Sequence, residues 1–163
     1  MIREACCAAA FVLAASHPAL AADIPAKLVP PPDAKLIGSY KATGAQIYVC
    51  TAQGSAIQPV FKAPEAQLME NDKPVAKHYA GPTWEATDGS KVVGKVAESV
   101  PASKEGDIPW LLLTAQSTGQ GLFAGVRFVQ RVETQGGAAG QTACPTAGTE
   151  LRVPYSATYR FFR

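Results

Sequence analysis

The stretch from His78 to Val96 has the sequence HYAGPTWEATDGSKVVGKV and predicts one β-hairpin. Its first strand carries Trp84, its turn is Asp88-Gly89-Ser90, and its second strand is rich in valine. Asp-Gly is typical of tight hairpin turns because glycine adopts a positive φ without a side-chain clash. Gly81-Pro82 indicates the bend at which the first strand begins. We therefore expect an antiparallel sheet that includes this hairpin.

The segments on either side of the hairpin predict further strands, separated by glycine and proline turns. Apolar and polar residues alternate from Glu150 to Arg163, as in a strand with one buried face. The apolar run from Ile108 to Ala115 fits a strand that is buried on both faces. We expect strands at 36–40, 46–51, 60–62, 108–115, 122–134 and 150–163, a turn at 43–45 and one helical turn at 64–69. Together these elements predict an all-β fold with little helix, either an antiparallel β-sandwich or a closed β-barrel.

Alternation also assigns side chains to faces of the expected strands. In the strand at 122–134, one face holds Val126, Phe128 and Val132, and the other holds Arg127, Arg131 and Glu133. Of the two tryptophans, Trp110 is expected in the core because three leucines follow it. Trp84 has the polar neighbours Thr83 and Glu85, so both a core and a surface position stay open for it.

The first 21 residues have the three-part pattern of a secretory signal peptide. Arg3 gives a positive start, residues 5–15 are apolar, and small residues precede the expected cleavage after Ala21 or Ala22. The apolar run is shorter than the roughly 20 residues of a membrane-spanning helix, so no membrane span is expected. The pattern predicts a secreted or periplasmic protein, with a proline-rich extended lead-in at 22–34 and a single β domain at 35–163. The lead-in is interpreted as a tether or, alternatively, as a proline-rich ligand for a partner.

Two cysteines, Cys50 and Cys144, remain after the expected cleavage. Cysteines of exported proteins commonly pair, because the compartment is oxidising, so we expect a Cys50–Cys144 disulfide. Closing a loop of about 95 residues contributes about 4–5 kcal/mol through the lost entropy of the unfolded chain. Two free thiols, or a catalytic cysteine served by His78, are the alternatives. With no Cys-x-x-Cys sequence and one remaining histidine, no metal site is predicted.

The charge pattern argues against a nucleic-acid partner. The net charge is +2, from 15 basic and 13 acidic residues, and the basic residues are scattered along the chain. No cofactor is predicted either, because the chain lacks a Gly-x-Gly-x-x-Gly sequence in a βαβ pattern.

The hairpin region concentrates the residues that are best suited to a site. We expect non-catalytic binding of a small molecule or a cell-envelope component in a groove lined by His78, Tyr79, Trp84, Glu85 and Asp88. The alternative is a small hydrolase that uses His78 with Glu85 or Asp88. At about 3.3 Å per residue of extended chain, His78 and Glu85 start roughly 23 Å apart. Only a sharp bend at Gly81-Pro82 brings them together.

Several motifs in order resemble one family of secreted bacterial and fungal proteins, the domain of unknown function 3455. The resemblance rests on residues 78–85, 88–90, 108–112, 130–131 and 134–137, on Cys144, and on Val153-Pro154-Tyr155. It extends over most of the chain from Ile24 to Phe162. The family has no established reaction, so the resemblance implies no activity. Some fungal members carry a malate dehydrogenase label, which is not transferred because the nucleotide-binding pattern is missing.

Overall fold

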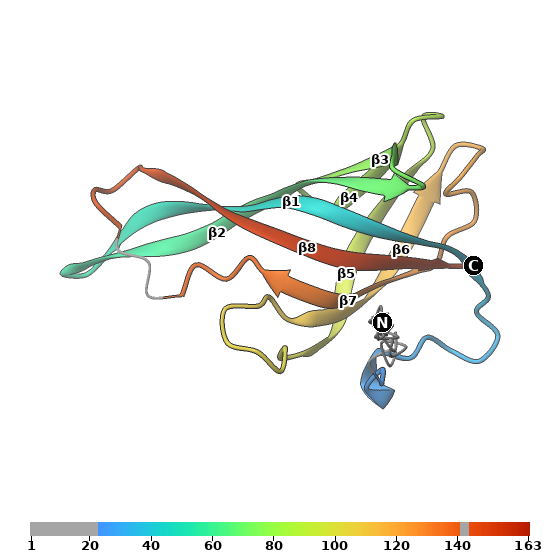
Figure 1. Ribbon diagram of the computed structural model, residues 1–163, viewed down its shortest axis with the longest axis horizontal. Helices are drawn as coiled ribbons and strands as arrows, with labels where there is room; N and C mark the ends of the chain where they lie inside the picture. Colours follow the sequence, from blue (N-terminus) through green and yellow to red (C-terminus); the bar gives the residue numbers. More distant parts are fainter. Residues whose placement is uncertain (1–22, 141–143) are drawn as a thin grey trace, which may run out of the picture.

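The computed structural model describes residues 23–140 and 144–163, and these form a closed barrel of antiparallel strands (Figure 1). The strands are β1 (Leu36–Gln53), β2 (Ala56–Glu70), β3 (Lys73–Tyr79), β4 (Thr83–Ala86), β5 (Lys91–Val100), β6 (Trp110–Thr118), β7 (Phe128–Gly136) and β8 (Glu150–Phe162). Each strand pairs with the next one in the sequence, and β8 returns to pair with β1. The prediction of an all-β fold is confirmed, and the barrel is the alternative that forms. The expected signal peptide lies outside the described residues.

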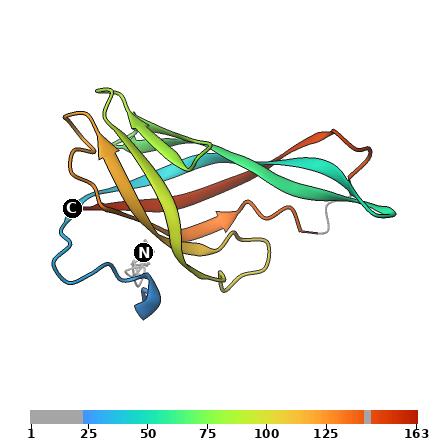
Figure 2. The same cartoon turned by 180° about the vertical axis from the view of Figure 1, so that it is seen from behind.

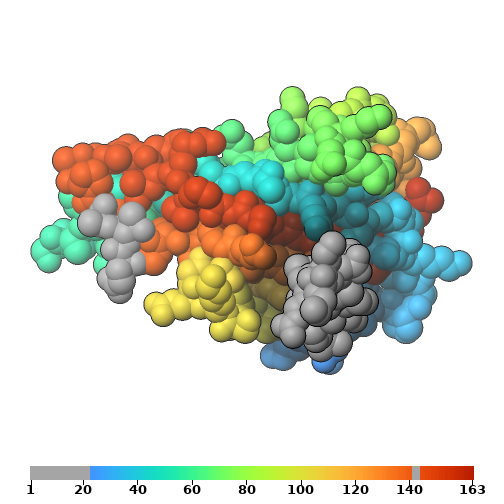
Figure 3. Space-filling view, viewed as in Figure 1, coloured from blue at the N-terminus to red at the C-terminus, as the bar shows by residue number. Residues whose placement is uncertain are grey.

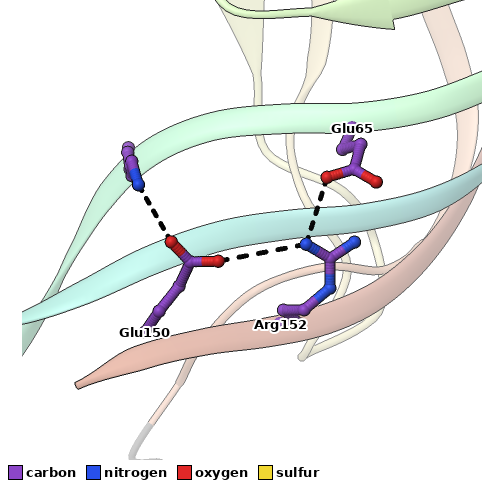
Figure 4. A network of polar contacts seen from close by, with 4 residues as sticks. Glu65, Glu150 and Arg152 are labelled. Atoms are coloured by element: carbon purple, nitrogen blue, oxygen red, sulfur yellow. Dashed lines mark hydrogen bonds and ion pairs between the residues drawn. The ribbon is translucent and has the colours of Figure 1, made fainter.

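Three strands continue past the barrel and form an arm (Figures 1 and 2). The 18-residue β1 pairs with the 15-residue β2 on one side and with the 13-residue β8 on the other, whereas β4 has four residues. The space-filling view shows this arm extending beyond the rest of the molecule (Figure 3). On the arm, Arg152 of β8 lies 3.1 Å from Glu65 of β2 and 3.9 Å from Glu150 (Figure 4). Glu150 in turn lies 2.9 Å from Lys62, so ion pairs link β2 and β8 across β1.

The disulfide between Cys50 and Cys144 is confirmed, with 5.5 Å between the two Cα atoms. It fastens β1 to the segment that leads into β8. Backbone hydrogen bonds reinforce the same junction, because Cys50 N donates to Thr149 O at 2.8 Å and Gly148 N donates to Cys50 O at 2.7 Å. The outer part of the arm, near the end of β1, is therefore held both covalently and by hydrogen bonds.

Two local predictions in the first half of the chain are wrong. No turn forms at 43–45, because β1 runs through these residues without a break. A Cβ at Gly44 would collide with the backbone of Glu65 and Ala66, so this glycine permits close approach of β2. The helical turn expected at 64–69 is part of β2, where buried Ala66 and Leu68 alternate with exposed neighbours at period two.

Two other predictions, for the lead-in and for β7, need correction. The lead-in is not extended throughout: Ala26–Leu28 forms a turn of 3₁₀ helix, η1, which packs on β5 and β6. Leu28 is buried, and its carbonyl oxygen accepts a 2.7 Å hydrogen bond from Gln130 Nε2. Leu112 and Leu113, on opposite faces of β6, are both buried, as expected for this strand. β7 begins only at Phe128, because the chain from Leu122 to Gly125 makes turns instead of extended structure.

The barrel interior is filled mainly by aromatic side chains. Trp84 is 1% exposed and packs edge-on against Tyr159 at 5.4 Å and Phe161 at 5.9 Å between ring centres. Phe123, from the loop before β7, fills the end of the barrel away from the arm, with its ring 4.5 Å from that of Phe161. Trp110 is only half-buried, so the prediction that it is a core residue is wrong. The described residues include no helix with the length and hydropathy needed to cross a membrane.

Candidate functional site

The turn between β3 and β4 brings His78 directly opposite Trp84. Gly81 has a φ of 101°, and Thr83 Oγ1 donates a 3.0 Å hydrogen bond to Ala80 O within this turn. The chain therefore bends sharply at Gly81-Pro82, and β3 pairs with β4 so that His78 and Trp84 are register partners. Their rings stack face to face, with centroids 4.4 Å apart and planes inclined by 4°. Both side chains point into the barrel, where Tyr159 also packs on His78 at 5.0 Å.

The same pairing places Glu85 on the outer face of the sheet. Its carboxylate accepts a 2.8 Å hydrogen bond from the Tyr79 hydroxyl and lies 3.3 Å from Lys91 Nζ. These two contacts hold the pKa of Glu85 below its ordinary value, and the bond to Glu85 raises the pKa of Tyr79. Glu85 and Tyr79 thus form a surface pair that is separated from His78 by the sheet.

Asp88 has a structural position in the β4–β5 turn. Its Oδ1 accepts hydrogen bonds from Ser90 N at 2.9 Å and Ser90 Oγ at 2.6 Å, and its Oδ2 accepts one from Leu122 N at 2.7 Å. The hydrogen bonds from Ser90, and then that from Leu122, lower the pKa of Asp88. Ser90 Oγ also accepts a 3.1 Å hydrogen bond from Phe123 N. Asp88 therefore fastens the loop that carries Phe123 to the barrel.

The five predicted site residues consequently occupy three separate places. His78 and Trp84 lie inside the barrel, Tyr79 and Glu85 lie on its outer face, and Asp88 lies in a turn. No hydrogen bond joins His78 to Glu85 or Asp88 among the described residues. The bend that a His78–Glu85 pair requires does form, but the alternation of β4 turns Trp84 rather than Glu85 toward the histidine.

His78 is an uncharged imidazole in this setting. It is 3% exposed, and its Nδ1 lies 2.9 Å from the carbonyl oxygen of Thr83. Because a carbonyl oxygen only accepts, Nδ1 carries the hydrogen and Nε2 carries the lone pair. Burial lowers the pKa of His78 to about 3; the hydrogen bond to Thr83 opposes this shift, and the charge of Arg131 adds to it.

His78 and Trp84 line a pocket of about 310 Å³ where the arm leaves the barrel. The β3–β4 turn, the loop before β6 and the base of the arm form its sides. Its lining is mainly aromatic, aliphatic and proline: Tyr48, Phe61, Pro64, Ala80, Gly81, Pro82, Val96, Ile108, Pro109, Leu111, Leu113 and Tyr159, with the polar side chains Gln46, Lys62 and Arg131. Phe61 is 52% exposed and Val96 is 49% exposed, so apolar surface continues to the rim. A second hollow, on the outer face, is lined by residues of β2, β3 and β4 that include Lys77 and Glu85.

Arg131, like Gln46 and Phe61, is a pocket residue that the sequence did not single out. Its Nε and Nη2 donate to Pro109 O at 3.1 and 2.9 Å, which holds the guanidinium at the wall. Burial raises the pKa of Tyr159, and Arg131 counters part of that rise. The alternation in this strand predicts that Arg131 lies opposite the valine face, but Arg131 is the register partner of inward-facing Tyr159. The Gln130-Arg131 motif indicates this position, because neighbouring residues of a strand point to opposite faces. Gln130 points outward and binds η1, so Arg131 points inward.

Two buried donors in the pocket lining have no hydrogen-bond partner among the described residues. They are Nε1 of Trp84 and Nε2 of Gln46, in side chains that are 1% and 2% exposed. Burial raises the pKa of Tyr155, and the Gln46 amide, which lies near the Tyr155 hydroxyl, counters a smaller part of this rise. The Gln46 Nε2 nevertheless makes no hydrogen bond of good geometry. Unpartnered buried donors are uncommon in native proteins and call for an explanation. The described residues contain no group of three or more His, Cys, Asp or Glu side chains that could hold a metal ion.

Residues 69–163 match the family described as "Protein of unknown function (DUF3455)". The match is shorter than the range expected from the motifs, since it begins at the end of β2 and leaves out β1. It includes His78, Trp84 and Arg131, whereas Gln46 and Phe61 precede it. Among curated proteins and among solved structures, nothing matches the chain significantly. The family match covers more than half of the chain, and the chain therefore belongs to the DUF3455 family of proteins of unknown function.

Proposed function

We propose that this protein is an exported, non-catalytic β-barrel domain that binds a small ligand in the pocket between the barrel and the arm. The observation that carries the proposal is an apolar, largely aromatic pocket containing buried donors without partners. Small-molecule sites commonly combine an apolar lining with a few convergent polar groups, often at the mouth of a β-barrel. The volume of about 310 Å³ lies at the lower end of the range for such sites.

Export is supported by two independent features. The first 21 residues have the signal-peptide pattern, and the Cys50–Cys144 disulfide is of the kind that persists in an oxidising compartment. Of the two ligand types expected from the sequence, the small volume of the pocket favours a small molecule over an extended envelope polymer.

The hydrolase alternative has less support. A general base needs its partner within hydrogen-bond reach, and the groups available to His78 are engaged elsewhere. Glu85 is bound to Tyr79 and Lys91 on the outer face, and Asp88 is bound to Ser90 and Leu122.

The test is to narrow the pocket without disturbing the core. Val96 lines the pocket and Val93 lies on the outer face of the same strand, and both are 49% exposed. Val96→Trp therefore fills the mouth, and Val93→Trp is the matched control. We expect ligands found by a thermal-shift screen of the oxidised protein to lose affinity with Val96→Trp and to keep it with Val93→Trp. Hits that bind both variants as well as the unaltered protein would exclude this pocket as the site.

A further inference from the structure

We infer that the ligand is a small carboxylate with an apolar body, and that its carboxylate pairs with Arg131. The inference rests on the proposed ligand-binding function and specifies the chemistry of the molecule that the pocket takes.

The pocket lining is positively charged. Its charged side chains are Lys62 and Arg131, and no Asp or Glu is among the described lining residues. Lys62 is neutralised from outside the pocket, because its Nζ lies 2.9 Å from Glu150 Oε2. Arg131 makes no ion pair with a carboxylate in the described part of the chain, although five other Lys or Arg side chains do. A partly buried cation without a counter-ion favours an anionic ligand.

The geometry of Arg131 leaves it able to bind an anion. A guanidinium has five N–H donors in a plane, and two of them, on Nε and Nη2, are bound to the single oxygen of Pro109. This anchoring fixes the plane of the guanidinium; the Tyr159 hydroxyl lies close to one further donor, and other donors remain available. A carboxylate accepts two parallel hydrogen bonds from such a group, a geometry that a single hydroxyl cannot reproduce.

The unpartnered groups of the lining also favour acceptors on the ligand. Trp84 Nε1 and Gln46 Nε2 are both donors, and both are buried beside the pocket. A ligand whose polar end carries two acceptor oxygens satisfies such donors, whereas an ammonium or an alkyl group leaves them unpaired. His78 Nε2 differs from these donors because it carries a lone pair and accepts a hydrogen bond. It can therefore bind a hydroxyl group or a water molecule.

The rest of the wall sets the body of the ligand. Pro64, Pro82 and Pro109 contribute no N–H groups, and Tyr48, Phe61 and Leu111 add apolar surface. At about 30 Å³ per water-sized group, the pocket holds on the order of ten non-hydrogen atoms. Phenylacetate has this size and chemistry and serves as the probe. Its neutral and cationic counterparts are 2-phenylethanol and 2-phenylethylamine.

The test is a calorimetric titration of the oxidised protein with these three probes at neutral pH. We expect phenylacetate to bind about tenfold to hundredfold more tightly than 2-phenylethanol, as for hydrogen bonds to a charged group, and the amine to bind most weakly. Arg131→Gln should abolish the preference for phenylacetate over 2-phenylethanol and change the affinity for the alcohol by no more than about threefold. Arg131→Lys should retain part of the preference for phenylacetate. Arg127→Gln is the matched control, since Arg127 pairs with Asp33 at 3.0 Å away from the pocket.

The outcomes separate this inference from the proposed function. Equal affinities for phenylacetate and 2-phenylethanol, both lost with Val96→Trp, would overturn the role of Arg131 and leave the pocket as the site. Failure of all three probes to bind at millimolar concentration would count against both. If Arg131→Gln lowers the melting temperature so far that it is unfolded, the preference of the unaltered protein and of Arg131→Lys decides, because a merely structural arginine gives no preference for the anion.

Discussion

The buried His78 should make the stability of this protein fall with pH well before its carboxylates titrate. Burial lowers the pKa of His78 to about 3 in the folded state, against 6.5 for an exposed imidazole. Between these values the unfolded chain binds a proton that the folded chain does not, so the free energy of unfolding decreases as the pH falls from about 6.5 towards 3. Above pH 6.5 both states hold a neutral histidine, and the effect disappears.

The magnitude follows from the size of the pKa difference. Each pH unit within the window contributes about 1.4 kcal/mol, so the step from pH 7 to pH 4.5 lowers the free energy of unfolding by about 2.5 kcal/mol. Asp and Glu in an unfolded chain titrate near pH 4, so their contributions fall mostly below this range. Without residues 1–21 the chain contains His78 as its single histidine, which makes the assignment simple.

The assay is urea unfolding of the oxidised protein at pH 4.5, 5.5 and 7. His78→Phe is the comparison, because phenylalanine keeps a ring against Trp84 and cannot take up a proton. We expect the stability of this variant to be nearly flat across the window, although it loses the hydrogen bond to Thr83. A fall of equal size in His78→Phe would show that another group causes it. A flat profile for the unaltered protein would show that His78 is not desolvated in solution.

Three further results are expected. Reducing the Cys50–Cys144 disulfide, whose cysteines are 94 residues apart, should lower the free energy of unfolding by about 4–5 kcal/mol, measured by urea unfolding with and without reductant; an unchanged midpoint would contradict the role given to this cross-link. Trp84→Ala should cost about 3–5 kcal/mol because it empties the centre of the barrel, and a loss below 1 kcal/mol in the same assay would refute its core position. Asp88→Ala should speed hydrogen exchange at the Leu122 amide, with exchange in β8 little changed; equal protection in variant and parent would mean that the turn does not hold the loop.

Strand positions were predictable where period-two alternation was undisturbed. The last strand is the best example, because Tyr155, Ala157, Tyr159 and Phe161 all face the interior as expected. Alternation failed as a guide at Gly44, which local rules assign to a turn, because its role is to let β2 approach. That requirement comes from a neighbouring strand about twenty residues away, which local sequence does not encode.

The candidate site was predictable only in part, for a related reason. The sequence placed a bend at Gly81-Pro82, and the bend forms. The side chains that the bend brings together depend on the strand register. Because His78 pairs with Trp84, Glu85 points to the outer face. The inward direction of Arg131 depends on barrel closure. Buried residues lie on both faces of β7, with Val129 inside and Gln130 outside, so polarity alone cannot identify the interior.

The turn that contains Asp88 affects how a ligand can reach the proposed pocket. By holding Phe123 across the far end, this turn closes that end of the filled barrel, so the pocket beside the arm has no opening through it. A ligand of the proposed pocket therefore enters and leaves by the same opening beside the arm. A small molecule that is attached to a larger carrier fits only if its attachment point lies at the opening of the pocket and its free end points into the pocket.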